Sequence, residues 1–563
     1  MKNIKNILLS ALCVSVLATS CIQEILPQTS TVTAAQAAAA PGAYDNFVNA
    51  LTSTLTGKFI YAGSDYRPYD IGLPGFYLVR DVMGQDIVYP YQNWFSAWYG
   101  VTNLGPTYAY AQLPWTVYYK WIKSCNTVIS LAFEGVEEGG EPAADKQDGL
   151  GIAYAMRAFN YMDMARMFAQ KPYTVDQTSE TVPIVTETTA LEDLPHNPRA
   201  TNADMWAFIV SDLDLAEKYI ANYKRADITT PDLSVVYGLK ARAYLEMGDW
   251  KNAQTYAKKA QSGYRIMTKE EYTSWETGFN TPNASWMFGM TYKADDPQIT
   301  NNDADSSWGS MMCMEINPET SGCGYAANYG QAFFIDRHLY ESMPLTDFRR
   351  DCFVDFAIDD LDEAGQLAAL ANYTAHPDWI YGIHNIQKDY AGRIGGTNLK
   401  FRTAGGEAGR NNQYLGFLVS VPIMRVEEMY LIEAEAAGMQ NEAEGRALLE
   451  TFARTRDANY VYGTHKDAYY NTSTPQIQNE CWWQRRVEFW GEGFATFDIK
   501  RLQKGVIRSY AGTNHGSPYR YNSQTTPDWM NFCIVQTEGN YNYSCTNNPD
   551  PINPGKDSEE FEW

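Results

Sequence analysis

The chain has 563 residues, with 67 Asp or Glu against 44 Lys or Arg, which gives a formal net charge of −23. This acidic balance argues against nucleic acid as a partner and against docking on an anionic membrane surface. Aromatic side chains are abundant, with 40 Tyr, 23 Phe and 15 Trp. Most must be core residues, but exposed Tyr and Trp also offer rigid contact area with a polar edge, which suits binding.

The first residues have the features of an export signal. Two lysines precede an apolar run over 7–18, which is too short to span a bilayer, and small residues follow it. We predict a signal peptide over 1–20. Its ending, Ala18-Thr19-Ser20-Cys21, resembles the lipobox of bacterial lipoproteins, in which the cysteine is acylated. A lipidated Cys21 with a polar tether over 21–42 would hold the chain at a membrane by lipid alone. A plain signal peptide with a chance cysteine is the alternative.

Seven further cysteines follow Cys21. Export permits disulfides, and the pairs Cys313–Cys323 and Cys533–Cys545 are close enough in sequence to be candidates. Cys125 and Cys481 fall in helical patterns, so we expect buried thiols there. Because no Cys-x-x-Cys or HExxH motif occurs, we predict no metal site and no cofactor.

Apolar residues recur every three to four positions in the first half of the chain and predict helices. Such stripes begin at Trp115, Ile152 and Trp206. Their spacing places Trp115, Tyr119 and Trp206 in the core. Thr201 followed by Asp204 is typical of a capping box at the start of one helix.

The segment 235–260 has small and aromatic residues where a tetratricopeptide repeat needs them. Alanines let two antiparallel helices approach closely, and Gly248-Asp249 would form the turn between them. A second helix pair is expected over 423–455, although an ordinary helical hairpin is the alternative for either segment. Because isolated repeats are unstable, such pairs must stack. We predict a mainly α fold with a tetratricopeptide-repeat-like helical scaffold over about 110–262 and 423–455, in a single domain spanning 43–563.

Two blocks lack clear periodicity, 60–110 and 265–420, and both are rich in Tyr and Trp. Long irregular stretches in a folded protein are usually functional. We therefore expect these loops to form a ligand face.

Several strings in the chain resemble the SusD/RagB family of outer-membrane lipoproteins from Bacteroidetes. The closest matches are the helix strings RVEEMYLIEAEA at 425–436 and RRVEFWGEG at 485–493. The family usually has an arginine at the place of Ala495. The weaker matches, in chain order, are AMRAF at 155–159, TVPIV at 181–185, PRAT at 198–201, DIKR at 498–501 and Asn548-Pro549. Together they cover nearly the whole chain after the signal peptide.

The resemblance implies a cell-surface lipoprotein of the outer membrane that acts as a lid over a SusC-like TonB-dependent transporter. Such proteins capture a nutrient, usually a glycan and sometimes a peptide, and deliver it inward. The helical repeats would face the transporter and the irregular segments would build the ligand face.

Enzyme chemistry has weak support in the sequence. Glu488 and Glu492 are four residues apart, but two carboxylates that hydrolyse a glycosidic bond must flank the sugar, and neighbours on one helix cannot. With Arg485 and Arg486 beside them, we expect a salt-bridged helix. The string at 303–307 lacks the glycine and the closing glutamate of a calcium loop, so we expect a loop of solvated acids.

A glycan site needs flat aromatics for the C–H faces of the sugar rings and fixed polar groups for the hydroxyls. The stretch from 80 to 99 supplies this mix, and the resemblance implies that the region after the repeat contributes too. The residues we expect at the ligand are Arg80, Asp81, Trp94, Trp98, Tyr99, Trp308, Tyr325 and Tyr329. Core packing is the alternative for each aromatic.

We therefore predict a binding protein, not an enzyme, that captures an oligosaccharide at the cell surface and hands it to a transporter. Three alternatives stay open: peptide uptake, a secreted glycoside hydrolase with a helical fold, and a structural lid without ligand specificity.

Overall fold

The structure is a computed structural model that describes residues 42–58, 67–89, 94–301, 304–322, 324–386 and 393–563. The chain divides into two compact units, Met1–Asn46 and Phe47–Trp563. In the first unit only residue 42 and the start of α3 (Ala43–Ser53) are described. The predicted signal peptide, Cys21 and the tether up to residue 41 therefore lie outside the described residues, and the single domain over 43–563 stays a prediction.

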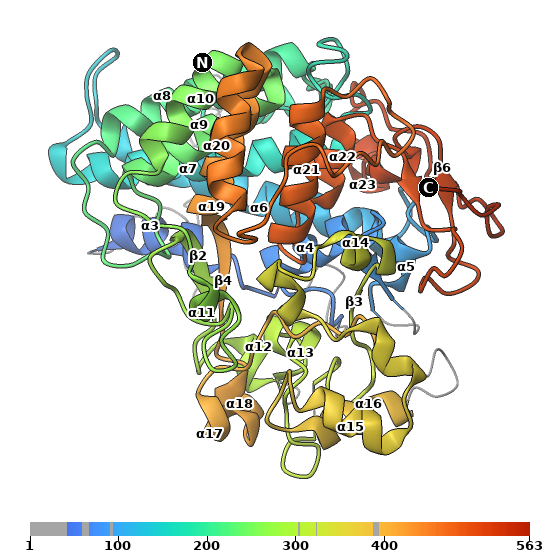
Figure 1. The fold of residues 1–563 in the computed structure, drawn as a ribbon. Helices are drawn as coiled ribbons and strands as arrows, with labels where there is room; N and C mark the ends of the chain where they lie inside the picture. Colours follow the sequence, from blue (N-terminus) through green and yellow to red (C-terminus); the bar gives the residue numbers. More distant parts are fainter. Residues whose placement is uncertain (1–41, 59–66, 90–93, 302–303, 323, 387–392) are drawn as a thin grey trace, which may run out of the picture. The chain divides into compact units, whose positions relative to one another are not determined.

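A series of packed helices forms the main body of the second unit (Figure 1). In chain order they are α6 (Ala109–Ala132), α7 (Ala144–Phe168), α8 (Asn202–Tyr219), α9 (Leu233–Met247), α10 (Trp250–Ala260), α19 (Val426–Gln440), α20 (Glu442–Ala453) and α21 (Gln476–Glu488). Each packs against the next up to α20, and α21 packs against both α19 and α20. This arrangement confirms the predicted mainly α scaffold of stacked hairpins. Trp115 and Trp206 are buried in it as expected, and Tyr119 is half-buried.

The hairpin α9–α10 shows why this sequence folds into closely packed pairs. Gly248 ends α9 with a φ of 68°, a left-handed conformation that suits glycine. Asp249 then begins α10, where its side chain accepts a hydrogen bond from the Asn252 amide. Ala253 and Ala257 are fully buried, so their small side chains let the helices approach. The predicted turn and repeat are therefore both present.

The hairpin α19–α20 depends on a still closer approach. A Cβ placed on Gly445 of α20 would lie 2.2 Å from the Cα of Gly438 on α19, so nothing larger than glycine fits there. Ala434 and Ala436 on α19 are fully buried. Because α10 packs against α19, the two predicted helix pairs stack on each other although about 165 residues separate them along the chain.

Strands are few among the described residues, and the longest pair closes off the second irregular block. β2 (Trp286–Thr291) pairs antiparallel with β4 (Ser420–Arg425), and β4 leads directly into α19. Two-residue pairs join β1 (Ile87–Val88) to β3 (Phe334–Ile335) and β5 (Val506–Ile507) to β6 (Asn522–Ser523). The block between β2 and β4 is thus an insertion whose two ends lie side by side.

Short helices occupy the two blocks that lacked periodicity. The first block holds α4 (Leu73–Val82) and α5 (Ser96–Tyr99). The second holds α11 (Lys269–Tyr272), α12 (Pro297–Thr300), α13 (Trp308–Met312), α14 (Arg337–Ser342), η3 (Phe348–Cys352), η4 (Phe356–Asp360), α15 (Glu363–Leu370), α16 (Pro377–Ile386), α17 (Gly406–Arg410) and α18 (Gln413–Gly416). Elsewhere lie η1 (Leu194–His196), α22 (Ala495–Arg501), η5 (Asp528–Met530) and α23 (Gln536–Tyr541). In Figure 1, α12, α13 and α15 to α18 lie together below the packed helices.

The cysteines depart from one expectation. Cys125 and Cys481 are buried thiols, as predicted. Cys533 and Cys545 are both free, and each sulfur lies near a backbone carbonyl: Pro549 O at 3.6 Å and Thr546 O at 3.7 Å. The candidate pair Cys533–Cys545 therefore does not form a disulfide. Cys313 is also a free thiol, and its proposed partner Cys323 lies outside the described residues.

Among the residues that the structure describes, no helix has the length and apolar character needed to cross a membrane.

Candidate functional site

Three of the expected ligand residues come together at the surface, and we call Trp94, Tyr325 and Tyr329 the aromatic patch. The Trp94 and Tyr325 ring centroids are 6.1 Å apart, and those of Tyr325 and Tyr329 are 5.4 Å apart. Trp94 is 37 % exposed and Tyr329 46 %, whereas Tyr325 between them is only 9 % exposed. The patch therefore presents two open rings on a buried third ring.

Hydrogen bonds fasten the loop that carries the two tyrosines to α13 and to the segment just before it. The backbone N–H of Tyr325 donates to Ser310 Oγ at 2.9 Å, and that of Gly324 donates to Asp305 Oδ1 at 2.9 Å. Tyr329 donates its hydroxyl hydrogen to the carbonyl of Gly322 at 3.1 Å. Asp305 is only 6 % exposed, so the expectation of a loop of solvated acids is wrong at this residue. Its carboxylate organises the loop beneath the patch.

Trp94 comes from the turn that precedes α5. Two buried rings of α5 anchor that turn: Trp98 packs edge-on against Tyr69 at 5.3 Å, and the Tyr99 hydroxyl lies 2.7 Å from His515 Nδ1. Burial raises the pKa of Tyr99 well above its usual value, so its hydroxyl stays neutral. Trp98 and Tyr99 hold the turn in place, and neither presents a ring face to solvent.

Five of the eight expected ligand residues are core residues, so the prediction that they line an open face is wrong. They are Arg80, Asp81, Trp98, Tyr99 and Trp308, each at most 3 % exposed. Arg80 pairs with Asp163 at 2.8 Å, and Asp81 accepts the N–H groups of Gly493 and Ala495. Trp308 packs edge-on against Phe401. Ligand contact at Trp94, Tyr325 and Tyr329 stays a prediction.

All ten residues of α4 are buried, which explains the error at Arg80 and Asp81. Their partners lie about 80 to 400 residues away in sequence, so local sequence could not show that their charges are matched inside the protein. Burial raises the pKa of Asp81 to about 7, although its two backbone hydrogen bonds oppose that shift.

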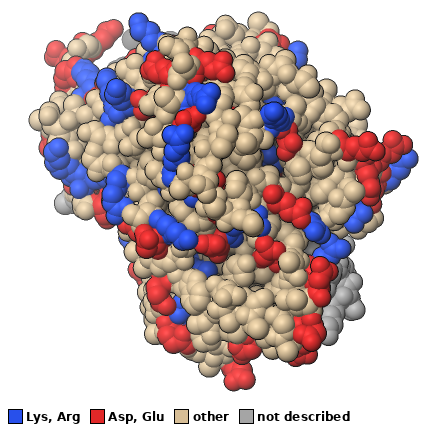
Figure 2. Space-filling view, in the orientation of Figure 1, with Lys and Arg blue, Asp and Glu red and all other residues tan. Residues whose placement is uncertain are grey.

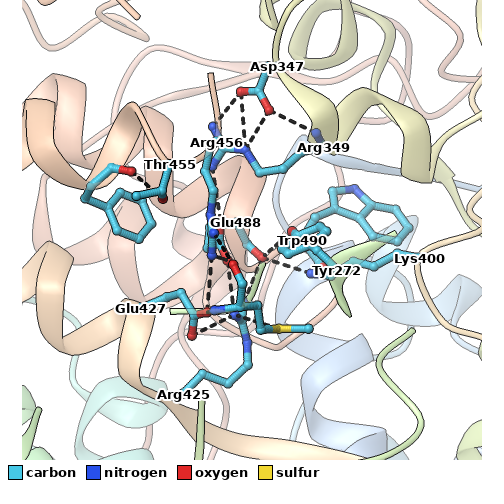
Figure 3. A network of polar contacts seen from close by, with 12 residues as sticks. Tyr272, Asp347, Arg349, Lys400, Arg425, Glu427, Thr455, Arg456, Glu488 and Trp490 are labelled. Atoms are coloured by element: carbon cyan, nitrogen blue, oxygen red, sulfur yellow. Dashed lines mark hydrogen bonds and ion pairs between the residues drawn. The ribbon is translucent and has the colours of Figure 1, made fainter. Parts of the chain in front are cut away.

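The paired glutamates that raised the possibility of an enzyme lie in a buried ionic network (Figure 3). Helix α21 ends at Glu488, so Glu492 lies in the following turn and not on the same helical face. Figure 3 shows Arg349, Arg425 and Arg456 directed at Glu488, with nitrogen-to-oxygen distances of 3.0 to 3.3 Å. The salt-bridged interpretation is confirmed, but with distant partners.

The partners expected for these glutamates are engaged elsewhere. Arg485 pairs with Asp498 at 2.6 Å, and Arg486 pairs with Asp86 at 2.5 Å. Glu492 instead contacts Lys400 at 2.7 Å and Arg425 at 2.9 Å. The only sequence signal for such pairing is the general rule that a buried cation needs a buried acid, and this rule does not say which one.

The negative charge on Glu488 is strongly stabilised. Burial alone would raise the pKa of Glu488, but the guanidinium groups of Arg456, Arg425 and Arg349 outweigh burial and hold the pKa well below its usual range. A carboxylate fixed in this way cannot act as a general acid near neutral pH. The network therefore serves the fold.

Neither cavities nor metal ligands point to another site in the described part of the chain. A cavity of only about 20 Å³ lies beside α21 and α22, and among the charged groups that line it Asp86 pairs with Arg486 and Asp498 pairs with Arg485. Among the described residues, no group of three or more His, Cys, Asp or Glu side chains could hold a metal ion.

Comparison with known proteins places the chain in a family. The model described as "Starch-binding associating with outer membrane" matches residues 79–245, and the model of the SusD family matches residues 391–549. The comparison with curated protein sequences finds no match.

Solved structures share the fold over nearly the whole chain. A SusD-like carbohydrate-binding protein from Bacteroides vulgatus ATCC 8482 is 21 % identical, with a TM-score of 0.67 over 90 % of this chain and 97 % of that one. A SusD superfamily protein from the same organism is 18 % identical, with a TM-score of 0.66 over 90 % and 98 %. Surface glycan-binding protein A from Bacteroides thetaiotaomicron, solved with laminarihexaose, is 18 % identical, with a TM-score of 0.62 over 90 % and 98 %. With both family models matched in chain order and the stacked hairpins in place, this chain belongs to the SusD/RagB family.

Proposed function

We propose that this protein captures a glycan at the aromatic patch, on the bacterial cell surface, and passes it to a partner transporter in the outer membrane. The observation that carries the proposal is the pair of open rings, Trp94 and Tyr329, held against the buried Tyr325. Each face of a sugar ring carries a patch of C–H groups, and a flat aromatic ring can remove that patch from water.

The support beneath the rings favours binding because it reduces the entropy that ligand capture costs. Ordering one flexible side chain at an interface costs about 0.5–1.5 kcal/mol. Here the ring contacts restrain Trp94 and Tyr329 before any ligand arrives, and hydrogen bonds to Ser310 and Asp305 fix the loop below them.

The relatives support the ligand class and the location. One structural neighbour was solved with laminarihexaose, and another is described as a carbohydrate-binding protein. The family model that matches residues 79–245 is described as associating with the outer membrane. A lipid on Cys21 would supply the attachment, and a SusC-like TonB-dependent transporter is the partner that the family resemblance implies.

Binding without covalent chemistry is the form of this function that the core geometry favours. Glu488 and Glu492 are occupied by cations inside the protein and cannot flank a sugar. If the protein is instead a hydrolase, incubation with a polysaccharide will release reducing ends. We expect none above the level of a heat-denatured sample.

Affinity gel electrophoresis and calorimetry with a glycan panel, including laminarihexaose and starch, test the proposal directly. We expect binding to at least one glycan and a loss of about tenfold or more, equal to about 1.4 kcal/mol, in each of Trp94→Ala and Tyr329→Ala. Tyr541→Ala is the matched control, because Tyr541 is 77 % exposed and lies outside the patch on α23. Undiminished binding by both patch variants would place the glycan elsewhere.

The transporter partner needs a separate experiment. Mild detergent extraction of outer membranes, followed by capture of the tagged full-length protein, should recover a large barrel protein in stoichiometric amount. A Cys21→Ala variant is the control, because we expect it to leave the membrane fraction. Recovery of the protein alone from intact membranes would count against the partner.

A further inference from the structure

The two segments that build the aromatic patch contain no basic residue. Trp94 lies in a stretch without Lys or Arg that runs from Asp81 to Tyr119, and Tyr325 and Tyr329 lie in a second such stretch, from Ala294 to Asp336. The second stretch also contains seven Asp or Glu residues. In a chain with 44 Lys and Arg, this places acids and no bases in the segments nearest the ligand.

One of these acids lies directly beneath the patch. The Asp305 carboxylate accepts the N–H of Gly324 at 2.9 Å and the hydroxyl of Ser310 at 3.5 Å, and Ser310 in turn accepts the N–H of Tyr325. Two hydrogen bonds, which meet at Ser310 Oγ, therefore connect the Asp305 carboxylate to the backbone N–H of Tyr325. Asp305 is only 6 % exposed, so the buried group beneath the rings is an acid and not a cation.

Two arginines of the second irregular block, Arg402 and Arg410, are already engaged. Arg402 contacts Glu315 at 3.0 Å, and Arg410 contacts Glu276 at 3.1 Å. Both arginine side chains are only 3 % exposed. Neither guanidinium is placed to form the exposed bidentate contact by which arginine recognises a carboxylate or a sulfate.

Charged side chains are unevenly spread over the face that Figure 2 shows. Lys and Arg gather mainly over the packed helices in the upper part of the view. The lower part, where α15 to α18 lie in Figure 1, is mostly uncharged, with Asp and Glu towards its margin.

We infer that the ligand of this site is an uncharged glycan, and that the site discriminates against glycans that carry uronate or sulfate groups. The inference rests on the proposed function. An anionic substituent on a sugar over Trp94 or Tyr329 would lose water and find no cation from the segments that form the patch. Both effects oppose binding of a charged glycan and leave a neutral one unaffected.

Matched polymers isolate the charge in this test. Laminarin and starch are each compared with a carboxymethyl derivative and a hydroxyethyl derivative of equal substitution, alongside natural neutral and acidic polysaccharides. For any polymer that binds, we expect the hydroxyethyl form to retain affinity within about threefold and the carboxymethyl form to bind at least tenfold more weakly. The difference in affinity between the hydroxyethyl and carboxymethyl forms should narrow in 1 M salt, where the Debye length falls to about 3 Å.

A charge-insertion variant tests whether the patch itself causes the discrimination. A Cβ on Gly322 meets nothing within 4 Å, and the carbonyl of Gly322 accepts the Tyr329 hydroxyl, so Gly322→Lys adds a cation beside the patch without a clash. We expect Gly322→Lys to reduce the loss of affinity that carboxymethylation causes, the carboxymethyl penalty, by threefold or more. Gly539→Lys on α23 adds the same charge at an equally open glycine outside the patch and should leave the penalty unchanged.

The outcomes separate this inference from the proposed function. Equal or tighter binding of carboxymethyl polymers, or binding of acidic polysaccharides alone, would overturn the inference while glycan capture stands. A carboxymethyl penalty that Gly322→Lys and Gly539→Lys change equally would show that the patch is not its source, and would also overturn the inference. If no polymer binds, charged or neutral, the proposed function fails and the inference fails with it.

Discussion

The substitution Glu488→Gln removes one buried negative charge from among three guanidinium groups. The side chain is fully buried, and it lies within 3.3 Å of Arg349, Arg425 and Arg456. Glutamine has almost the same shape, so the change tests charge and hydrogen bonding with little effect on packing. Removing one partner of a buried ion pair typically costs about 3–5 kcal/mol, because the remaining charge stays buried without its counter-ion.

The structure places this substitution near the lower end of that range. Each of the three arginines keeps another carboxylate: Arg349 keeps Asp347 at 2.7 Å, Arg425 keeps Glu492 at 2.9 Å, and Arg456 keeps Glu427 at 3.2 Å. We therefore expect a loss of about 3 kcal/mol in the free energy of unfolding. Urea unfolding followed by circular dichroism measures it as a shift of the midpoint at a constant slope.

The pH dependence supplies an independent check. Because the folded pKa of Glu488 lies below its unfolded value, its stabilisation is complete above the unfolded pKa of about 4.3 and is lost as the pH falls through the folded pKa. The difference in the free energy of unfolding between wild type and Glu488→Gln should stay constant from pH 7 to about pH 5 and narrow only in stronger acid. Glu341→Gln is the control: it breaks an exposed helical pair with Arg337 at 2.6 Å, which is worth about 0.3–0.5 kcal/mol. A loss in Glu488→Gln no larger than in this control would refute the reasoning.

Three further predictions concern the scaffold. Gly445→Ala should destabilise the protein by about 1–3 kcal/mol in urea unfolding, because its Cβ would overlap the backbone of α19. The control Gly539→Ala has open space around the new Cβ and should cost less than about 1 kcal/mol, so equal losses in the two variants would refute the close approach of α19 and α20. Burial lowers the pKa of Lys500 to about 7, so the free energy of unfolding should rise with pH between about 7 and 10. Lys500→Met should lack that rise, and parallel pH profiles of wild type and Lys500→Met would contradict the prediction. Without reductant, a thiol reagent should label both Cys533 and Cys545 once the protein is unfolded, and a mass two hydrogens short would reveal a disulfide instead.

The helical scaffold could be predicted from sequence because its signals are local. Gly248-Asp249 and the alanines of 235–260 define one hairpin within 26 residues, and the structure contains it. The second irregular block could not be predicted in the same way. Its helices are mostly four to ten residues long, too short to develop a periodic stripe, and its boundary depends on β2 pairing with β4 about 130 residues later.

The candidate site shows the same division between local and distant information. The sequence indicated that Trp94, Tyr325 and Tyr329 were suited to a ligand, but it gave the same indication for Trp98 and Trp308, which are core residues. An aromatic residue next to polar residues has the same local pattern whether it faces solvent or a buried ion pair. Only the distant partners distinguish the two cases. The lack of Lys and Arg in the two segments was readable in the sequence, but its meaning required the fold to bring those segments together.

The most direct test of the central claim is a structure of the full-length protein with a bound oligosaccharide, using laminarihexaose or the tightest ligand from the glycan panel. The account predicts sugar rings within about 4 Å of the exposed faces of Trp94 and Tyr329, in contact with the loop that carries Tyr325. An ordered oligosaccharide on another surface, with the aromatic patch open to solvent, would contradict it.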